Sequence, residues 1–135
     1  MFADRYQIPI TFQETISADA TRSIARAEGG MRVESVDVFN SANLATHATN
    51  YVVFQLINLG TDATGTTVIA TASTSQTTGS AMTANVAFPL TVTAAAAELT
   101  DGQALGFVYN ESTTDVANSQ IINVVVRYTQ LGPTS

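Results

Sequence analysis

Alternation of apolar and polar residues with a period of two constrains this chain more than any other feature. In IINVVVRYT, near the C-terminus, Ile122, Val124, Val126 and Tyr128 alternate with a more mixed set that begins at Ile121. Successive side chains of a β-strand point to opposite faces. The pattern therefore predicts a strand whose first set faces a core and whose second set faces a mixed surface.

The same kind of pattern recurs along the chain, separated by polar loops rich in Thr, Ser, Asn and Gly. Short strands at regular spacing, joined by such loops, are typical of sandwiches and barrels. We therefore predict an all-β fold, a single-domain antiparallel β-sandwich that is jelly-roll-like, with about eight strands. The predicted strands are 5–12, 21–28, 31–40, 50–60, 66–73, 85–92, 104–110 and 121–129.

Several residues suggest where these strands lie. Strand 50–60 is apolar on both faces, which predicts a central strand whose second face is covered. Pro9 and Pro89 lack a backbone donor and predict edge positions. Gly29-Gly30 predicts a tight hairpin between strands 21–28 and 31–40, although Ala25 to Glu28 leave a helix open.

No linker or change of composition divides the chain, so we expect one domain. Within it, residues 1–14 form an N-terminal strand or an extended arm, and residues 15–135 form the β-sandwich. The first ten residues lack a basic segment followed by an apolar run, so we expect no secretory signal. No stretch approaches the roughly 20 apolar residues of a membrane span.

The stretch TAAAAELTDGQALGFVY, residues 93–109, combines two signals. Alanine has the highest helix propensity, yet residues on both sides read as strand. We predict a tight 3₁₀ or single-turn crossover from Ala94 to Leu99, followed by a turn at Asp101-Gly102. A helix of two or three turns is the alternative, although helices that short are marginal.

Charge limits the possible partners. The net charge is −6 and all five basic residues are arginine, which argues against nucleic acid as a partner. Four of the arginines lie in the first quarter of the chain, either as a small basic patch for an acidic partner or as ordinary surface residues, which are the commoner case. Our candidate partner-binding residues are Arg5, Tyr6, Arg22, Arg26, Arg32 and Tyr51.

Catalytic and metal-binding patterns are lacking. The chain has no cysteine, and its single histidine, His47, has no acidic residue within nine positions, whereas a catalytic or ligating histidine needs such partners. There is no G-x-S-x-G elbow and no tryptophan platform for sugars. We predict no enzyme activity, no cofactor and no metal site. A weak cation site in the loops, at Glu98 and Asp101 or at Glu111 and Asp115, stays open.

Three stretches resemble one protein family. They are RVESVDVFNSANLATHATNYVVFQLINLG, the region from VIATAST through TANVAFPLTVTAAAAELTDGQALGFVYN, and IINVVVRYT. Together they resemble the capsid decoration, or cement, proteins of tailed bacteriophages over residues 31–129. The stretch TAAAAELTDGQAL carries most of this resemblance.

The resemblance implies a non-enzymatic virion protein, made in the host bacterial cytoplasm, that binds the outer surface of an icosahedral capsid. Its partner would be the major capsid protein, which it would reinforce against internal DNA pressure, as a homotrimer at local threefold positions. The segment 1–14 would then extend as an arm over neighbouring subunits. Alternatives are a phage tail or fibre component, a β-sandwich carbohydrate-binding module, and a cupin-type enzyme, which would need a His/Glu metal cluster.

Overall fold

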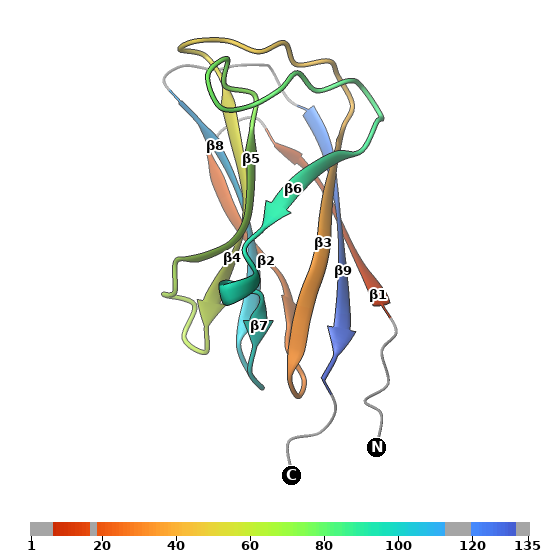
Figure 1. The fold of residues 1–135 in the computed structure, drawn as a ribbon, viewed down its shortest axis with the longest axis vertical. Helices are drawn as coiled ribbons and strands as arrows, with labels where there is room; N and C mark the ends of the chain where they lie inside the picture. The colour runs from red at the N-terminus through yellow and green to blue at the C-terminus, as the bar shows by residue number, and fades with distance from the viewer. Residues whose placement is uncertain (1–6, 17–18, 113–119, 132–135) are drawn as a thin grey trace.

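The computed structural model describes residues 7–16, 19–112 and 120–131. They form an elongated sandwich of strands with loops gathered at one end (Figure 1). Within these residues, the one helix is a three-residue 3₁₀ turn, and no helix is long and apolar enough to cross a membrane. The elements are β1 (Gln7–Ile16), β2 (Ala20–Arg26), β3 (Met31–Asn40), β4 (Val52–Gly60), β5 (Thr67–Ser73), β6 (Phe88–Val92), η1 (Ala94–Ala96), β7 (Glu98–Leu99), β8 (Ala104–Glu111) and β9 (Gln120–Gln130).

Two four-stranded antiparallel sheets make the sandwich. The β3 sheet has the order β1-β9-β3-β6, and the β4 sheet has the order β2-β8-β4-β5. Strand β6 joins them, because Phe88–Leu90 pair with β3 while Thr91 and Val92 pair with β5. With the two-residue β7 set aside, this arrangement is a jelly roll. The predicted all-β, jelly-roll-like fold of about eight strands is therefore confirmed.

Aromatic rings cross the core from one sheet to the other. Phe12 on β1 contacts Phe107 on β8, with ring centroids 6.3 Å apart, and Phe107 stacks on Phe54 of β4 at 6.1 Å. Phe54 also meets Phe88 of β6 edge-on at 6.0 Å. Offset and edge-on ring pairs add to the stabilisation from burial, so this row links both sheets through the middle of the sandwich.

Strand β4 is central, between β5 and β8, as predicted. Its inward residues are fully buried, and on its outer face Ile57 and Leu59 are only 6% exposed. Both lie over Gly106 of β8, where an added Cβ would come within 2.9 Å of Leu59 Cδ1 and 3.2 Å of Ile57 Cγ1. Because Gly106 has no Cβ, Ile57 and Leu59 can pack over it. This explains why the outer face of β4 is apolar in the sequence.

The prolines lie where the lack of a donor is tolerated. Pro9 is on β1, the outermost strand of the β3 sheet, opposite Arg127. Pro89 is on β6 and pairs on one side only, with Asp37.

The expected boundary between residues 14 and 15 falls inside β1, where residues 7–14 pair with β9.

The predicted hairpin at Gly29-Gly30 is wrong. Strand β2 pairs with β8, and β3 pairs with β9, β6 and β7, so the two glycines connect opposite sheets. Gly29 does adopt a positive φ of 73°, and its N–H donates to Asp101 Oδ1 at 2.8 Å. The glycine turn was correctly located, but turn residues alone do not determine which strands pair. Ala25 and Arg26 lie in β2 and not in a helix.

The alanine stretch is a crossover between the sheets, as predicted. Ala94–Ala96 form the 3₁₀ turn, and the adjoining Ala97 is 1% exposed and accepts a hydrogen bond from the N–H of Val33 at 2.9 Å. Gly102 then adopts a φ of 87° in the turn before β8. The longer helix is excluded because β7 starts at Glu98 and pairs with Arg32.

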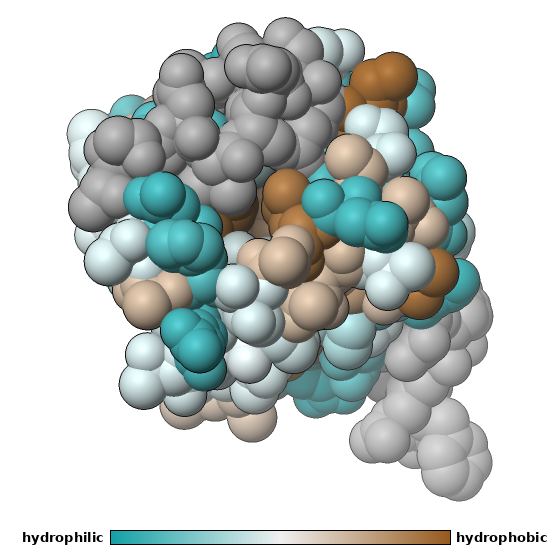
Figure 2. Space-filling model, turned by 90° about the horizontal axis from the view of Figure 1, so that it is seen from above, coloured by the Kyte–Doolittle hydropathy of each residue, from teal (hydrophilic) through white to brown (hydrophobic). Residues whose placement is uncertain are grey.

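Loops close the end of the sandwich that lies opposite the 3₁₀ turn η1 (Figure 1). Leu44 and Met82 exchange backbone hydrogen bonds of 2.8 Å and are both buried as part of the core. Seen from this end, polar residues dominate, with a few apolar patches at the rim and near the centre (Figure 2). The loops 41–50 and 74–86 therefore act as a lid that continues the core.

Candidate interaction surfaces

The structure distributes the candidate partner-binding residues over several faces. Arg22 and Arg26 lie on the edge strand β2, whereas Arg32 lies on β3 and Tyr51 just before β4. Arg5 and Tyr6 lie outside the described residues. The four candidates that the structure does describe, three arginines and one tyrosine, are therefore not gathered into one patch, and their role in binding stays a prediction.

Arg32 belongs to a charged cluster on β3. Its Nε lies 3.0 Å from Glu34 Oε1, and its Nη1 lies 3.7 Å from Glu98 Oε1. Glu34 Oε1 also accepts a hydrogen bond from the Thr129 hydroxyl at 2.8 Å. These contacts connect β3 to β7 and β9. The charged side chains of the cluster therefore have a structural role.

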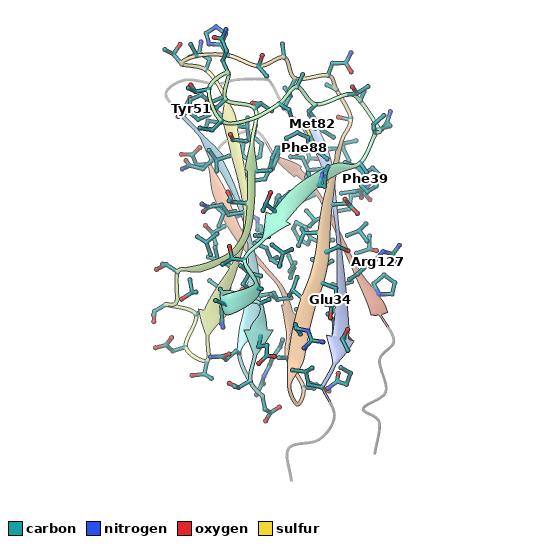
Figure 3. The ribbon with its side chains drawn as sticks, in the orientation of Figure 1. Glu34, Phe39, Tyr51, Met82, Phe88 and Arg127 are labelled. Atoms are coloured by element: carbon teal, nitrogen blue, oxygen red, sulfur yellow. The ribbon has the colours of Figure 1, made fainter. Side chains whose placement is uncertain are left out.

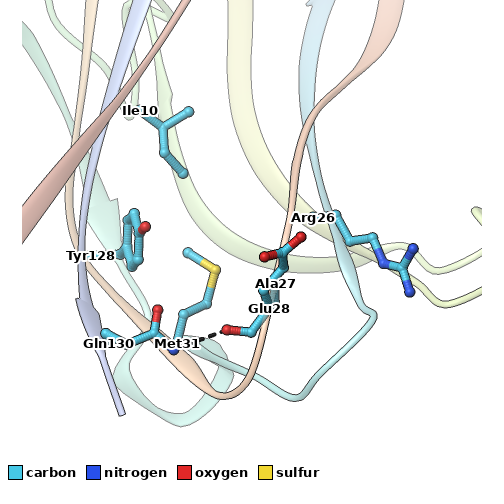
Figure 4. Close-up of a pocket in the computed structure, with 7 residues that line it drawn as sticks. All are labelled: Ile10, Arg26, Ala27, Glu28, Met31, Tyr128 and Gln130. Atoms are coloured by element: carbon cyan, nitrogen blue, oxygen red, sulfur yellow. Dashed lines mark hydrogen bonds between the residues drawn. The ribbon is translucent and has the colours of Figure 1, made fainter. Parts of the chain in front are cut away.

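A pocket of about 260 Å³ opens at the lower end, between the edge strands β1 and β2 (Figure 4). Ile10, Met31 and Tyr128 form its apolar part, with Arg26 and Glu28 at the opening. Gln130 Nε2 donates to the Glu28 and Gly30 carbonyls at 2.9 and 3.0 Å. Among its described lining residues, there is no serine, threonine or cysteine with a base beside it.

His47 and the acidic loop residues have structural partners. The Nδ1 atom of His47 accepts the N–H groups of Thr49 at 3.1 Å and Asn50 at 2.9 Å. Glu98 and Asp101, proposed for a weak cation, contact Arg32 and the Gly29 N–H respectively. Asp115, proposed with Glu111, lies outside the described residues. Within the described part of the chain, no three His, Cys, Asp or Glu side chains converge on a possible metal position.

The large exposed apolar side chains gather around one end of β3. Among the described residues these are Val86, 53% exposed, and Ile121, 47% exposed. They flank the strand end, because the Asn85 N–H donates to Asn40 O on one side and the Ser41 N–H donates to Ile121 O on the other. Phe39, next to the buried Val38, is half-buried and lies near the same end of β3 (Figure 3). We call Phe39, Val86 and Ile121 the apolar corner.

The apolar corner continues into the outer face of the β3 sheet. Phe39 and Arg127 both point away from the core on this side (Figure 3). On its β1–β9 side the face is uncharged, with Thr11 paired to Val125 and Gln13 paired to Asn123. On β3 it carries charges, because Asp37 pairs with Val125 and the Arg32–Glu34 pair lies further along the strand. Arg127 is exposed and has no ion pair with any residue that the structure describes. A sheet face with an apolar corner and mixed polar and charged residues around it suits contact with another protein more than it suits a small ligand.

Comparison with known proteins shows distant fold similarity only. No protein-family model matches the chain, and no curated protein matches it either. A chain in the structure described as the Cyanophage Pam1 capsid asymmetric unit is 17% identical, with a TM-score of 0.49, covering 90% of this chain and 79% of that chain.

Two further solved structures are more distant. A chain of infectious bursal disease virus, Gx strain, is 14% identical with a TM-score of 0.34, covering 98% of this chain and 39% of that chain. An alpha-amino acid ester hydrolase is also 14% identical, with a TM-score of 0.29, covering 91% of this chain and 25% of that chain. Similarities this distant do not establish a shared function.

The apolar corner was only partly visible in the sequence. The alternation in IINVVVRYT places Ile121 on the mixed, outward face, and Phe39 follows the inward Val36 and Val38 at an odd offset. Val86 was expected in strand 85–92, but β6 begins at Phe88 and leaves Val86 in the preceding loop. That the three meet at one strand end depends on the pairing of β3 with β9 and β6, which the sequence did not reveal.

Proposed function

We propose that this protein is a non-enzymatic virion structural protein that binds the outer surface of an icosahedral phage capsid as a decoration, or cement, protein. Its partner is the major capsid protein, and it acts by binding energy alone. The observation that carries this proposal is the apolar corner at the end of the outer face of the β3 sheet, because exposed apolar patches rimmed by polar residues mark protein interaction sites.

The size of the face supports binding as a trimer. Four strands at about 4.8 Å spacing and about eight residues at 3.3 Å per residue span roughly 500 Å². A stable interface buries roughly 800 Å² on each partner, so one face alone would bind weakly. Three faces held in a homotrimer would multiply the affinity, since each further contact becomes intramolecular.

The sequence supports the same proposal independently. The stretch TAAAAELTDGQAL carries the resemblance to decoration proteins, and in the fold it is the crossover that joins β6 to β8. The low charged fraction, 12%, also suits a surface that is covered by a protein partner, since charged residues are depleted at interface cores.

Residues 1–6 extend the proposal. They precede β1, whose residues from Gln7 onward pair with β9, and they include Arg5 and Tyr6. We propose that they reach a neighbouring capsid subunit as an arm. Removing residues 1–6 leaves the β1–β9 pairing in place, so loss of capsid binding with unchanged melting supports the arm, and unchanged binding refutes it.

The proposed function is tested by mixing the purified protein with empty shells of the phage's major capsid protein. The expected result is co-sedimentation at a fixed ratio and a higher temperature of shell disruption. A protein that never sediments with shells would refute the proposal. Binding to purified tails but not to shells would identify the tail or fibre alternative instead.

A further inference from the structure

A hydroxyl-lined pocket of about 390 Å³ lies on the outer face of the β4 sheet, the sheet opposite the apolar corner. Its walls come from β4, β5 and β6 and from the loop after β5. The lining residues used below are Tyr51, Val53, Thr71, Ser73, Thr78 and Thr91.

Strand register forms the floor of the pocket. Val53 of β4 pairs with Ser73 of β5, and Thr71 of β5 pairs with Thr91 of β6. Paired residues of neighbouring strands point to the same face. The hydroxyls of Thr71 and Thr91 therefore stand side by side next to the Val53 and Ser73 pair.

A tight loop forms the wall that carries Thr78. The Gly79 N–H donates to Ser75 O at 2.8 Å, and the Ser80 N–H donates to Ser73 O at 3.1 Å, so the loop folds back onto β5. A Cβ at Gly79 would lie 2.0 Å from Ser73 O, which only glycine avoids. Backbone contacts therefore hold this loop, and with it Thr78, close to β5. The threonine side chain does not determine this position.

The pocket is neutral and rich in unused hydroxyls. Among the described residues, no charged side chain lines it. Within the part of the chain that the structure describes, the hydroxyls of Tyr51, Thr71, Thr78 and Thr91 have no hydrogen-bond partner. Each hydroxyl can donate one hydrogen bond and accept others, and the half-buried ring of Tyr51 adds an apolar surface with a polar tip.

We propose that this pocket binds a neutral saccharide. Sugars combine hydroxyls, which the threonines can match, with an apolar ring face, which Tyr51 can contact. An anionic ligand would lack a cationic partner here, and a purely apolar ligand would leave desolvated hydroxyls unpaired, at a cost. The volume lies at the lower end of the range for ligand pockets, about 300–1,000 Å³, which suits one or two sugar rings. The site is independent of capsid binding through the opposite sheet.

The test follows backbone amide NMR signals of the full chain while single sugars are added. The probes are glucose, galactose, mannose, rhamnose and N-acetylglucosamine, with sialic acid as the anionic comparison. We expect at least one neutral sugar to shift the amide signals of Thr71, Ser73 and Thr91, with a Kd of about 1 mM or weaker, equivalent to about −4 kcal/mol.

Variants separate binding from folding. Tyr51→Ala is expected to weaken binding by about tenfold or more, and Tyr51→Phe less, because it keeps the ring. Thr91→Val keeps a β-branched side chain on an exposed strand position and is expected to weaken binding without affecting folding. Tyr128→Phe, at the lower end of the molecule, is the matched control and is expected to bind normally.

Three results would overturn the proposal. The first is that no neutral sugar shifts these signals. The second is that sialic acid alone shifts them. The third is that Thr91→Val and a folded Tyr51→Ala protein both bind as tightly as the Tyr128→Phe control. None of these results bears on co-sedimentation with shells, so the two proposals fail separately.

Discussion

Glu14 on β1 and Arg22 on β2 form an ion pair across the open side of the sandwich, with Arg22 Nε 2.8 Å from both carboxylate oxygens. Glu14 pairs with the buried Ile122, and Arg22 pairs with the buried Phe107. Both side chains therefore belong to the inward-facing rows of two edge strands that do not pair with each other. The ion pair links the two sheets on the side opposite β6.

The Glu14–Arg22 pair is expected to contribute modestly to stability. The two side chains are 28% and 47% exposed, and solvent screening limits such pairs to about 0.2–1 kcal/mol. A double-mutant cycle of Glu14→Gln and Arg22→Gln, measured by urea unfolding, should give a coupling free energy in that range that shrinks as salt is added. Zero coupling at low salt would show that the ion pair does not link the sheets energetically.

The aromatic row predicts that replacing Phe54 by alanine destabilises the fold much more than replacing Phe39. Phe54 is fully buried and contacts three other rings, so Phe54→Ala should lower the free energy of unfolding by about 3–5 kcal/mol. Phe39 lies on the outer face, and Phe39→Ala should cost about 1 kcal/mol or less. Denaturant unfolding of both variants checks this. Equal losses would contradict the assignment of Phe39 to the outer face.

Asp62 predicts a specific pH dependence. The Thr64 hydroxyl and N–H donate to Asp62 Oδ1 at 2.7 and 3.1 Å, which lowers the pKa of this carboxyl below its ordinary value of 3.8. Because folding lowers this pKa, the charged form stabilises the fold above pH 3.8, and that contribution is lost as pH falls through the lowered value. Carboxyl NMR titration should show the pKa returning toward 3.8 in Thr64→Ala. An unchanged pKa would show that the hydroxyl is not its main cause.

Strand positions were predictable from the sequence, and pairing partners were not. Alternation in the IINVVVRYT stretch depends only on neighbouring residues, so it indicated β9 within one residue at either end. The Gly29-Gly30 turn was equally visible, yet it joins opposite sheets, because pairing is decided by contacts distant in sequence, such as those of β2 with β8. The two-residue β7 was missed for the same reason, since its pairing with Met31 and Arg32 defines it.

The composition of the surfaces, like the strand pairing, depends on residues that are distant in sequence. Tyr51 was selected as a candidate and lines a pocket, but its neighbours Thr71, Thr78 and Thr91 come from other segments that only the fold brings together. The arginines drew attention because they are rare, and the described ones are spread over two sheets. Composition indicates that a residue is unusual; it does not indicate which residues share a face.

The apolar corner predicts a local loss of capsid binding. Ile121→Asp places a charge on an exposed position, so the fold should keep its stability within about 0.5 kcal/mol, while binding to shells should weaken by about tenfold or more because the buried charge is unpaired. Thr67→Asp, on an exposed position of β5 in the other sheet, is the matched control. Co-sedimentation titrations compare the two, and equal binding would exclude the apolar corner as the contact.

Cryo-electron microscopy of empty shells saturated with this protein tests capsid binding most directly. If the protein is a decoration protein, the map should show density for the jelly roll on the outside of the shell, with the apolar corner and the outer face of the β3 sheet buried in protein contacts. Shells without added density, or bound copies whose β3-sheet face is open to solvent, would contradict it.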